Sequence, residues 1–407
     1  MLKAVPIDDL KPGMYINQVL KQTGSLRMRS KGLVKHQTVI NTLKSRGIQT
    51  VQVDFEKSLN HEPSTDSVPL STPEASTQAP TKLEKGQQIA QNSLTRNAMK
   101  EANGLYFDAV NIQNGFLSAL NRGAVNDLKL VKDLAQSLID SIFDNKDALS
   151  CLTLIKNNNA YLLEHSINCS ILMGMFTQFL GYDRETIDQA SLGALLMDVG
   201  MSSLPMDVHN NVEDLSAADW EVMKTHVDIG VELVQQCGEI SDLVLSIIAQ
   251  HHERIDGSGY PNALKEIEIS EFARIAGIID TYDAMVSNRP HKESISPTQA
   301  LKRLTEDDRL DQTLVSQFVT CMGVHPVGSI VRLKSGKLAI VSQQNPLSTM
   351  SPIVMTFYSV PSQQYGDITR LDLSANDDEI VSGVRPDDFN VNLSTFFQDV
   401  LVNQAPD

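Results

Sequence analysis

The stretch His251-His252-Glu253-Arg254-Ile255-Asp256-Gly257-Ser258-Gly259-Tyr260-Pro261 places two adjacent histidines directly before a glycine-rich turn. Neighbouring side chains on a regular helix diverge by about 100°, so joint metal binding by this pair requires a helix end near His251. The Asp-Gly-Ser-Gly segment supplies that break, and Tyr260 then places an aromatic ring on a restricted backbone. Such a turn alone is most often only a turn, but its position after His-His-Glu favours a functional site.

Four further residues of metal-ligand type lie at intervals typical of helical hairpins: His165, Asp198, His226 and Asp280. A single histidine such as His165 or His226 is more often a core or surface residue than a ligand. On successive helices of a bundle, however, the whole set predicts a shared metal centre. Imidazole and carboxylate ligands suit Mn, Fe, Ni or Zn, and a bridging carboxylate fits the ion pairs that activate water for phosphate-ester cleavage.

Length and composition favour a water-soluble protein of several domains. The 407 residues exceed the ~100–200 of a typical domain, and 41% hydrophobic with 21% charged residues is a soluble balance. No run approaches the ~18 apolar residues of a membrane span, and the acidic start lacks a signal-peptide core, so we expect a cytoplasmic location. The net charge of −16 disfavours binding to nucleic acid polymers, and the 4 scattered cysteines predict neither disulfides nor a thiolate zinc site.

The chain divides by composition into four predicted segments. Residues 1–57 contain strand-like alternation around a helical pattern at 36–46 and predict a small α/β domain. Residues 58–82 are rich in Pro, Ser and Thr and predict a disordered linker, whereas residues 83–325 carry apolar side chains at helical spacing. Residues 326–407 are β-rich. We expect a mainly α fold: a helical bundle preceded by the α/β domain and followed by a small β module.

Together these motifs, with Asp280-Thr-Tyr-Asp283 and Asn288-Arg289-Pro290, resemble HD-GYP domains. Members of that family are metal-dependent phosphodiesterases that open the bacterial second messenger cyclic di-GMP. The resemblance implies a helical HD-type bundle and a divalent transition metal, with Fe or Mn preferred. It also implies ligand roles: His165 and Asp280 for one ion, His226, His251 and His252 for the other, and Asp198 as the catalytic bridge between them. Arg289 would contact a substrate phosphate, and Asp283 would cap a helix or support a ligand. The aromatic ring of Tyr260 suits a pocket rim or a partner contact, and we expect it to bind substrate.

Two substitutions depart from the family's His-Asp-x-Gly-Lys signature. Met197 stands where the histidine is expected, and a thioether is a poor substitute for imidazole on a borderline cation. Met201 stands where a lysine would meet the substrate phosphate, a loss of ~1.5–3 kcal/mol if it resembles other hydrogen bonds to charged groups. Tyr161 replaces a glutamate associated with a third metal, and His209, in a surface-like loop, is not expected to compensate. We predict one or two ions, with one site impaired.

Two functions from different classes follow. The first is hydrolysis of cyclic di-GMP to pGpG or GMP, slowed by the lost ligand and lysine. The second is a catalytically inactive HD-GYP domain that serves as a nucleotide receptor or protein-interaction module. A purely structural scaffold is disfavoured, because decay would have eroded the polar ligands indiscriminately. A diguanylate cyclase or another signalling protein is the candidate partner, and a homodimer is the candidate assembly.

Overall fold

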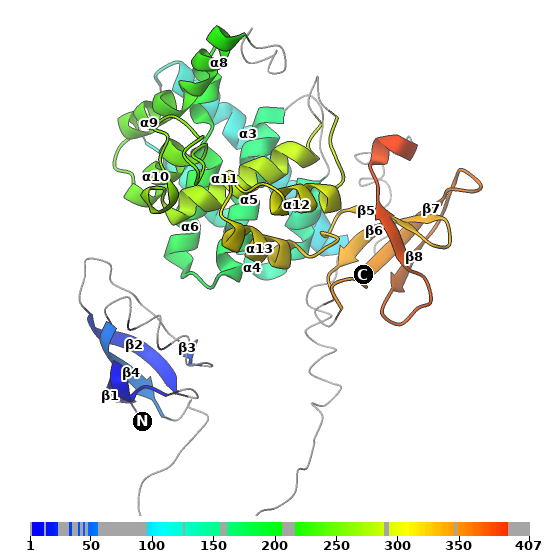
Figure 1. Cartoon of the computed structure of the whole chain (residues 1–407), viewed down its shortest axis with the longest axis horizontal. Coiled ribbons are helices and arrows are strands. Elements are labelled where there is room, and N and C mark those ends of the chain that lie inside the picture. Colours follow the sequence, from blue (N-terminus) through cyan, green and yellow to red (C-terminus); the bar gives the residue numbers. More distant parts are fainter. Residues whose placement is uncertain are drawn as a thin grey trace, which may run out of the picture. The chain divides into compact units, whose positions relative to one another are not determined.

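The computed structural model of the chain describes residues 2–11, 14–22, 32–34, 40, 44, 48–55, 96–124, 127–154, 161–205, 216–288, 293–345 and 348–389. The chain forms two compact units, Met1–Pro80 and Thr81–Asp407 (Figure 1). The linker predicted at 58–82 and most of the helix predicted at 36–46 lie outside the described residues. His209 and Arg289 lie outside them as well.

The first unit is built on an antiparallel sheet with strand order β1-β4-β2-β3. Its strands are β1 (Leu2–Pro6), β2 (Tyr15–Gln22), β3 (Gly32–Leu33) and β4 (Ile48–Asp54), and the short helix η1 (Ile7–Asp9) follows β1. Alternation along β4 buries Val51 and Val53 in a small core with Ile16 and Ile40. The unit therefore has its own apolar core.

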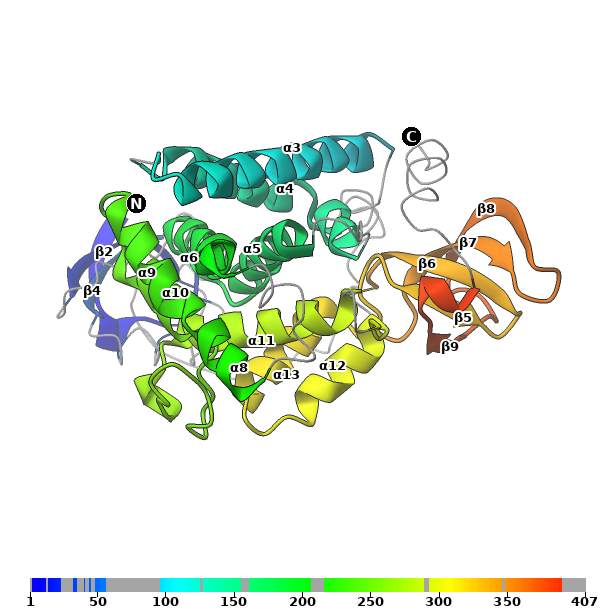
Figure 2. The same cartoon turned by 90° about the horizontal axis from the view of Figure 1, so that it is seen from above.

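The second unit begins with helices arranged around one central helix. They are α3 (Arg96–Asn121), α4 (Lys129–Thr153), α5 (Tyr161–Phe179), α6 (Arg184–Leu196), η2 (Val199–Ser203), α8 (Ala217–Lys224), α9 (His226–Gln236), α10 (Asp242–Gln250), η3 (Glu266–Glu268), α11 (Glu271–Val286), α12 (Pro297–Thr305) and α13 (Gln312–Met322). Every residue of α5 from position 164 to 177 is buried, as expected for a helix enclosed on all sides. It lies between α3 and α4 on one side and α11 and α13 on the other (Figure 2).

Local sequence signals fix where the helices that lead to the ligands begin. Asp183 caps α6 by accepting from the backbone N of Thr186, and Ser241 caps α10 by accepting from Val244 N at 3.3 Å. At α8, Ser216 and Asp219 form a reciprocal capping box. Asp198, His226 and His251 each come one or two residues after the end of one of these helices. The caps therefore fix where the helices begin that lead to these three residues.

A second antiparallel sheet, with strand order β8-β7-β6-β5-β9, completes the unit. Its strands are β5 (Ile330–Leu333), β6 (Lys337–Gln343), β7 (Ile353–Ser359), β8 (Gln364–Asp372) and β9 (Ile380–Gly383), followed by η4 (Pro386–Phe389). The β5–β6 turn uses Gly336 at φ 80°, a conformation that suits glycine. Val331 and Leu338 belong to the same core cluster as the helices. The predicted mainly α fold with small terminal sheets is confirmed.

Among the described residues, no helix combines the length and apolar character required to cross a membrane.

Candidate metal centre

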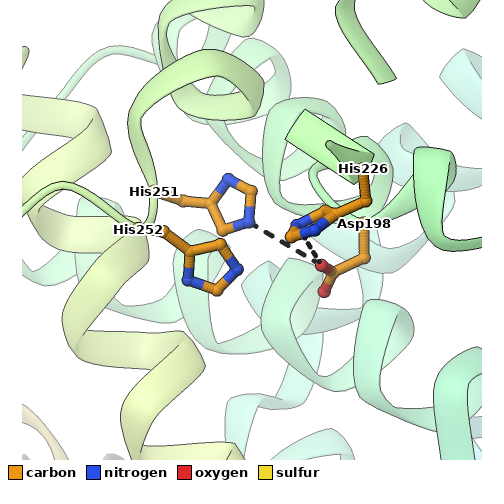
Figure 3. A group of neighbouring side chains, drawn as sticks. All are labelled: Asp198, His226, His251 and His252. Carbon is orange, nitrogen blue, oxygen red and sulfur yellow. Dashed lines mark ion pairs between the residues drawn. The ribbon is translucent and has the colours of Figure 1, made fainter. Parts of the chain in front are cut away.

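The end of α10 brings His251 and His252 to one centre. The helix stops at Gln250, and His251 is its C-cap, so the two rings are not separated as they would be on a continuing helix. Their centroids lie only 4.0 Å apart. Together with Asp198 and His226, they form a compact group whose ligand atoms lie within 4.8 Å of one another (Figure 3). The helix end required by the sequence argument is therefore present.

Backbone hydrogen bonds orient two of these imidazoles. His226 Nδ1 donates to the carbonyl oxygen of Met223 at 2.7 Å, and His251 Nδ1 donates to that of Ile248 at 2.9 Å. The Nε2 atoms then face Asp198 Oδ1, at 3.5 Å from His226 and 3.7 Å from His251 (Figure 3). Neither buried Nε2 has a hydrogen-bond partner among the described residues. Because an unsatisfied buried nitrogen is costly, this donor set fits a bound divalent transition metal.

Asp198 also faces a second group. His165 Nε2 lies 3.3 Å from Asp198 Oδ2 and 3.2 Å from Asp280 Oδ1, and these three residues form the second cluster of ligand type. One carboxylate oxygen of Asp198 thus faces each cluster. The arrangement has the form of a carboxylate bridge between two adjacent cation positions.

The electrostatics of the site favour the protonation states that a cation requires. Burial raises the pKa of Asp198, but the favourable interaction of its carboxylate with the neighbouring His165 and His251 outweighs burial and holds this pKa well below its ordinary value. Burial lowers the pKa of His226. Burial, followed by the charge of His251, also lowers the pKa of His252 well below its ordinary value. Near neutral pH the carboxylate is therefore ionised, and His226 and His252 carry lone pairs.

Asp283 supports the centre from outside. Its Oδ2 accepts from His165 Nδ1 at 2.8 Å, which leaves His165 Nε2 to face Asp198 and Asp280. Asn168 Nδ2 donates to the other oxygen of Asp283 at 3.2 Å, and Ser287 Oγ donates to Oδ2 at 3.1 Å. A carboxylate behind a ligating histidine fixes both the tautomer and the direction of the ring. Asp283 therefore lies directly behind the ring of His165 and holds it by a hydrogen bond.

The two methionines add apolar packing where the sequence lacks the expected polar groups. Met197 follows the last residue of α6, is fully buried and belongs to the main apolar core. Met201 packs against Leu204 and Met223. The cluster at His165 consequently offers three residues of ligand type, against four in the cluster at His226.

A buried glutamate organises the loop after the histidine pair. Glu253 is 4% exposed, and its carboxylate accepts from the backbone N of Asn262 at 2.7 Å and of Leu264 at 3.0 Å. The resulting loop stacks the ring of Tyr260 on His252, with centroids 4.6 Å apart and planes at 28°. Burial raises the pKa of Tyr260, so the phenol stays neutral. Tyr260 therefore borders the group of candidate ligands.

Glycines allow the ligand-bearing backbones to approach one another. A Cβ at Gly200 would overlap the carbonyl oxygen of His226 and lie 2.7 Å from the backbone N of Gly230. A Cβ at Gly277 of α11 would lie 2.9 Å from the carbonyl oxygen of His251. A Cβ at Gly259 would overlap the backbone of Glu253 and Arg254. Close packing around the centre explains these glycines better than turn conformation alone.

Gly200→Ala is expected to destabilise the protein by about 3 kcal/mol and to lower its metal content, because backbone atoms of α9 cannot yield as a side chain would. Gly230→Ala is the matched control. Its Cβ would meet the side chain of Ile248 at 3.3 Å, and alanine favours a helix interior by ~1 kcal/mol over glycine. Thermal unfolding with metal analysis checks both variants. Equal stability of the two alanine variants would contradict this packing explanation.

Trp220 and Lys224, both on α8, lie beside Tyr260 and were not singled out by the sequence analysis. The Trp220 ring is 42% exposed and lies 6.1 Å from the Tyr260 ring at 75°. Lys224 Nζ lies 5.9 Å from the centre of the Tyr260 ring and pairs with Glu221 at 2.6 Å. The sequence did offer one signal, since Trp220 is the chain's single tryptophan and lies among charged residues.

Comparisons with known proteins place two family regions on the chain. Residues 150–314 match the family described as HD domain, and residues 2–131 match a domain of unknown function, DUF3391. The chain is 28% identical over 371 residues to the cyclic di-GMP phosphodiesterase PA4108 of Pseudomonas aeruginosa, covering 89% of this chain and 87% of that protein. The 3'3'-cGAMP-specific phosphodiesterase 2 of Vibrio cholerae is 26% identical over 178 residues, covering 44% of this chain and 33% of that protein.

Among solved structures, Bd1817, an HDG"Y"P protein from Bdellovibrio bacteriovorus, aligns with a TM-score of 0.47 at 18% identity, covering 78% of this chain and 98% of that chain.

Proposed function

We infer that this protein is a metal-dependent phosphodiesterase of cyclic di-GMP. Residues 150–314 match the HD domain family, in line with the resemblance of the sequence to HD-GYP domains. One observation carries the proposal: Asp198 directs one carboxylate oxygen to the His226 cluster and the other to the His165 cluster. The relative that spans most of this chain is a cyclic di-GMP phosphodiesterase by name. The two buried Nε2 atoms provide independent support for a cation at the site.

A cation held there would activate water for attack at phosphorus and offset the negative charge that develops on the phosphoryl oxygens. The protein's own residues determine where this happens. Asp198, ionised by its histidine neighbours, sets the position of the centre, and Asp283 fixes the ring of His165. Tyr260 limits access from the side of His252. Hydrolysis adds water across one P–O3′ bond, so that the product is linear pGpG with a free 3′ hydroxyl.

We propose that the His226 cluster is the stronger metal position and that the His165 cluster is impaired. The His226 cluster combines three imidazoles with Asp198, a set that suits Fe(II) or Mn(II). The His165 cluster has Met197 where the family places a further imidazole. From this difference we expect the protein to hold either one ion or two ions with unequal occupancy. We also expect hydrolysis to be slow. A diguanylate cyclase partner and a homodimer stay predictions.

A second candidate function is nucleotide binding without turnover. The apolar packing of Met197 and Met201 favours it, because both side chains stand where the family uses a ligand and a phosphate contact. In this function the His226 cluster and Tyr260 would still hold a nucleotide phosphate and base. A receptor of this kind would signal by changing its affinity for a partner protein.

The decisive experiment supplies purified full-length protein with Fe(II) or Mn(II) under anaerobic conditions and follows cyclic di-GMP by chromatography. Bound metal is measured in the same sample. Metal-dependent formation of pGpG establishes the phosphodiesterase. Bound metal and bound nucleotide without product establish the receptor, and the absence of both rejects the two functions together. Cyclic GMP-AMP as a competing substrate tests the choice of nucleotide.

Trp220→Ala is expected to raise the KM for cyclic di-GMP about tenfold, because base–aromatic stacking is worth ~1–3 kcal/mol. The perpendicular rings of Trp220 and Tyr260 form an aromatic corner beside His252, suited to a guanine base. Quenching of the single tryptophan's fluorescence by the nucleotide gives a direct reading in the wild type. Val222→Ala, an exposed apolar change on the same helix, is the control. Equal KM values for both variants would remove Trp220 from the substrate site.

A further inference from the structure

A chain of buried hydrogen bonds runs from α3 to the His165 cluster. The Tyr106 hydroxyl donates to Asn168 Oδ1 at 2.8 Å, and Asn168 Nδ2 donates to Asp283 Oδ1 at 3.2 Å. The other oxygen of Asp283 accepts from His165 Nδ1 at 2.8 Å. The exposed fractions along this chain are 8%, 0%, 0% and 4%. Water therefore competes little with any of these links.

We propose that Tyr106 is a positioning residue of the metal centre, which acts through Asn168 and Asp283 to hold the ring of His165 in its ligating direction. This makes α3 a structural part of the centre. The inference rests on the proposed function for the assignment of His165 as a metal ligand. It adds a residue, and a helix, that the family resemblance does not assign.

The chemistry of Asn168 explains why the tyrosine hydroxyl matters. The amide NH2 of Asn168 faces two acceptors, the carbonyl oxygen of Thr153 at 3.2 Å and Asp283 Oδ1 at 3.2 Å. Its oxygen must then receive a donor from elsewhere, and the Tyr106 hydroxyl is that donor. Burial raises the pKa of Tyr106 well above its ordinary value, so the hydroxyl keeps its proton. Without that donor the buried amide oxygen of Asn168 is unsatisfied. The orientation of the amide that directs its NH2 group toward Asp283 is then less strongly favoured.

The network also joins the two family regions of the chain. Tyr106 lies in the region 2–131, which matches the domain of unknown function and extends from the N-terminal sheet through α3 to the start of α4. Asn168, Asp283 and His165 lie in the region 150–314, which matches the HD domain family. The N-terminal family region thus includes α3, from which the side chain of Tyr106 reaches the residues that surround the metal centre. A change in the packing of α3 would be felt at His165 through defined hydrogen bonds.

The test is the affinity for Mn²⁺, measured by titrating metal-free full-length protein. Tyr106→Phe removes one hydroxyl and is expected to weaken the second, weaker step of Mn²⁺ binding, which reports on the His165 cluster, by about 3-fold to 10-fold, the equivalent of one net hydrogen bond. Tyr282→Phe is the matched control. Tyr282 is also buried, but its hydroxyl has no hydrogen-bond partner among the described residues, so removal of this hydroxyl should leave the Mn²⁺ affinity unchanged.

A double substitution separates positioning from general packing. Asp283→Asn should weaken Mn²⁺ binding by about 10-fold to 100-fold, as is usual for a partner of a ligating histidine. In that background Tyr106→Phe should have almost no further effect, because its route to His165 is already broken. An unchanged Mn²⁺ affinity in Tyr106→Phe, or an undiminished effect beside Asp283→Asn, would overturn the proposal. Wild-type protein that binds Mn²⁺ without hydrolysing cyclic di-GMP would contradict only the proposed enzyme, whereas failure to bind Mn²⁺ would overturn both.

Discussion

His251→Ala is expected to reduce bound metal to background and to lower cyclic di-GMP hydrolysis more than ~100-fold, beyond the usual cost of changing a residue behind a ligand. His251 is fully buried, and its Nδ1 is engaged by the carbonyl oxygens of Ile247 and Ile248. Its remaining nitrogen faces Asp198 and has no partner among the described residues. A cation is the partner that this nitrogen fits best, so its loss removes a ligand rather than a structural hydrogen bond. Metal analysis and the chromatographic assay measure the two effects.

His325→Ala provides the control for lost packing. His325 is also a buried histidine, at 6% exposed, and its Nδ1 interacts with Thr298 Oγ1 at 3.1 Å, away from the ligand clusters. This variant should lose stability and yet keep its metal. If His251→Ala retained the wild-type metal content, the assignment of the His226 cluster as the stronger metal position would be wrong. Parallel losses of metal in both variants would instead indicate general unfolding.

Met197→His combined with Met201→Lys is expected to raise bound metal from about one ion per chain toward the two of a paired site, and to speed hydrolysis at least ~10-fold. The histidine would add a nitrogen next to Asp198 in the cluster that now has three residues of ligand type. The lysine would restore an ammonium for the substrate phosphate. Without metal the new imidazole sits in an apolar core, where a buried polar group costs ~1–3 kcal/mol, so the variant should be less stable until metal is added.

Three single variants show how much of the gain in bound metal and in hydrolysis comes from each of the two substitutions. Met197→Leu keeps an apolar side chain of similar volume and should leave metal content unchanged. Met197→His alone should raise metal content, and Met201→Lys alone should lower the KM without adding metal. No increase of metal in the double variant would show that position 197 does not face the cation. Hydrolysis that rises without extra metal would assign the gain to Met201.

The sequence by itself determined the set of candidate ligands and the architecture. His165, Asp198, His226, His251, His252 and Asp280 could be selected because imidazole and carboxylate groups recur at helical-hairpin intervals, and their chemistry is a property of residue type. The mainly α fold followed from apolar periodicity, and the end of α10 followed from the geometry of two adjacent histidines. These are local features, which neighbouring residues decide.

Only the tertiary structure decided how distant residues share that chemistry. The spacing of Asp198 could not show that its two oxygens face different clusters, nor that Gly200 is required by the carbonyl oxygen of His226. The links from Tyr106 through Asn168 to Asp283 join positions up to 115 residues apart in sequence. Hydrogen bonds and ring contacts of this kind depend on how helices pack in space. The spacing of residues along the chain does not indicate how the helices pack.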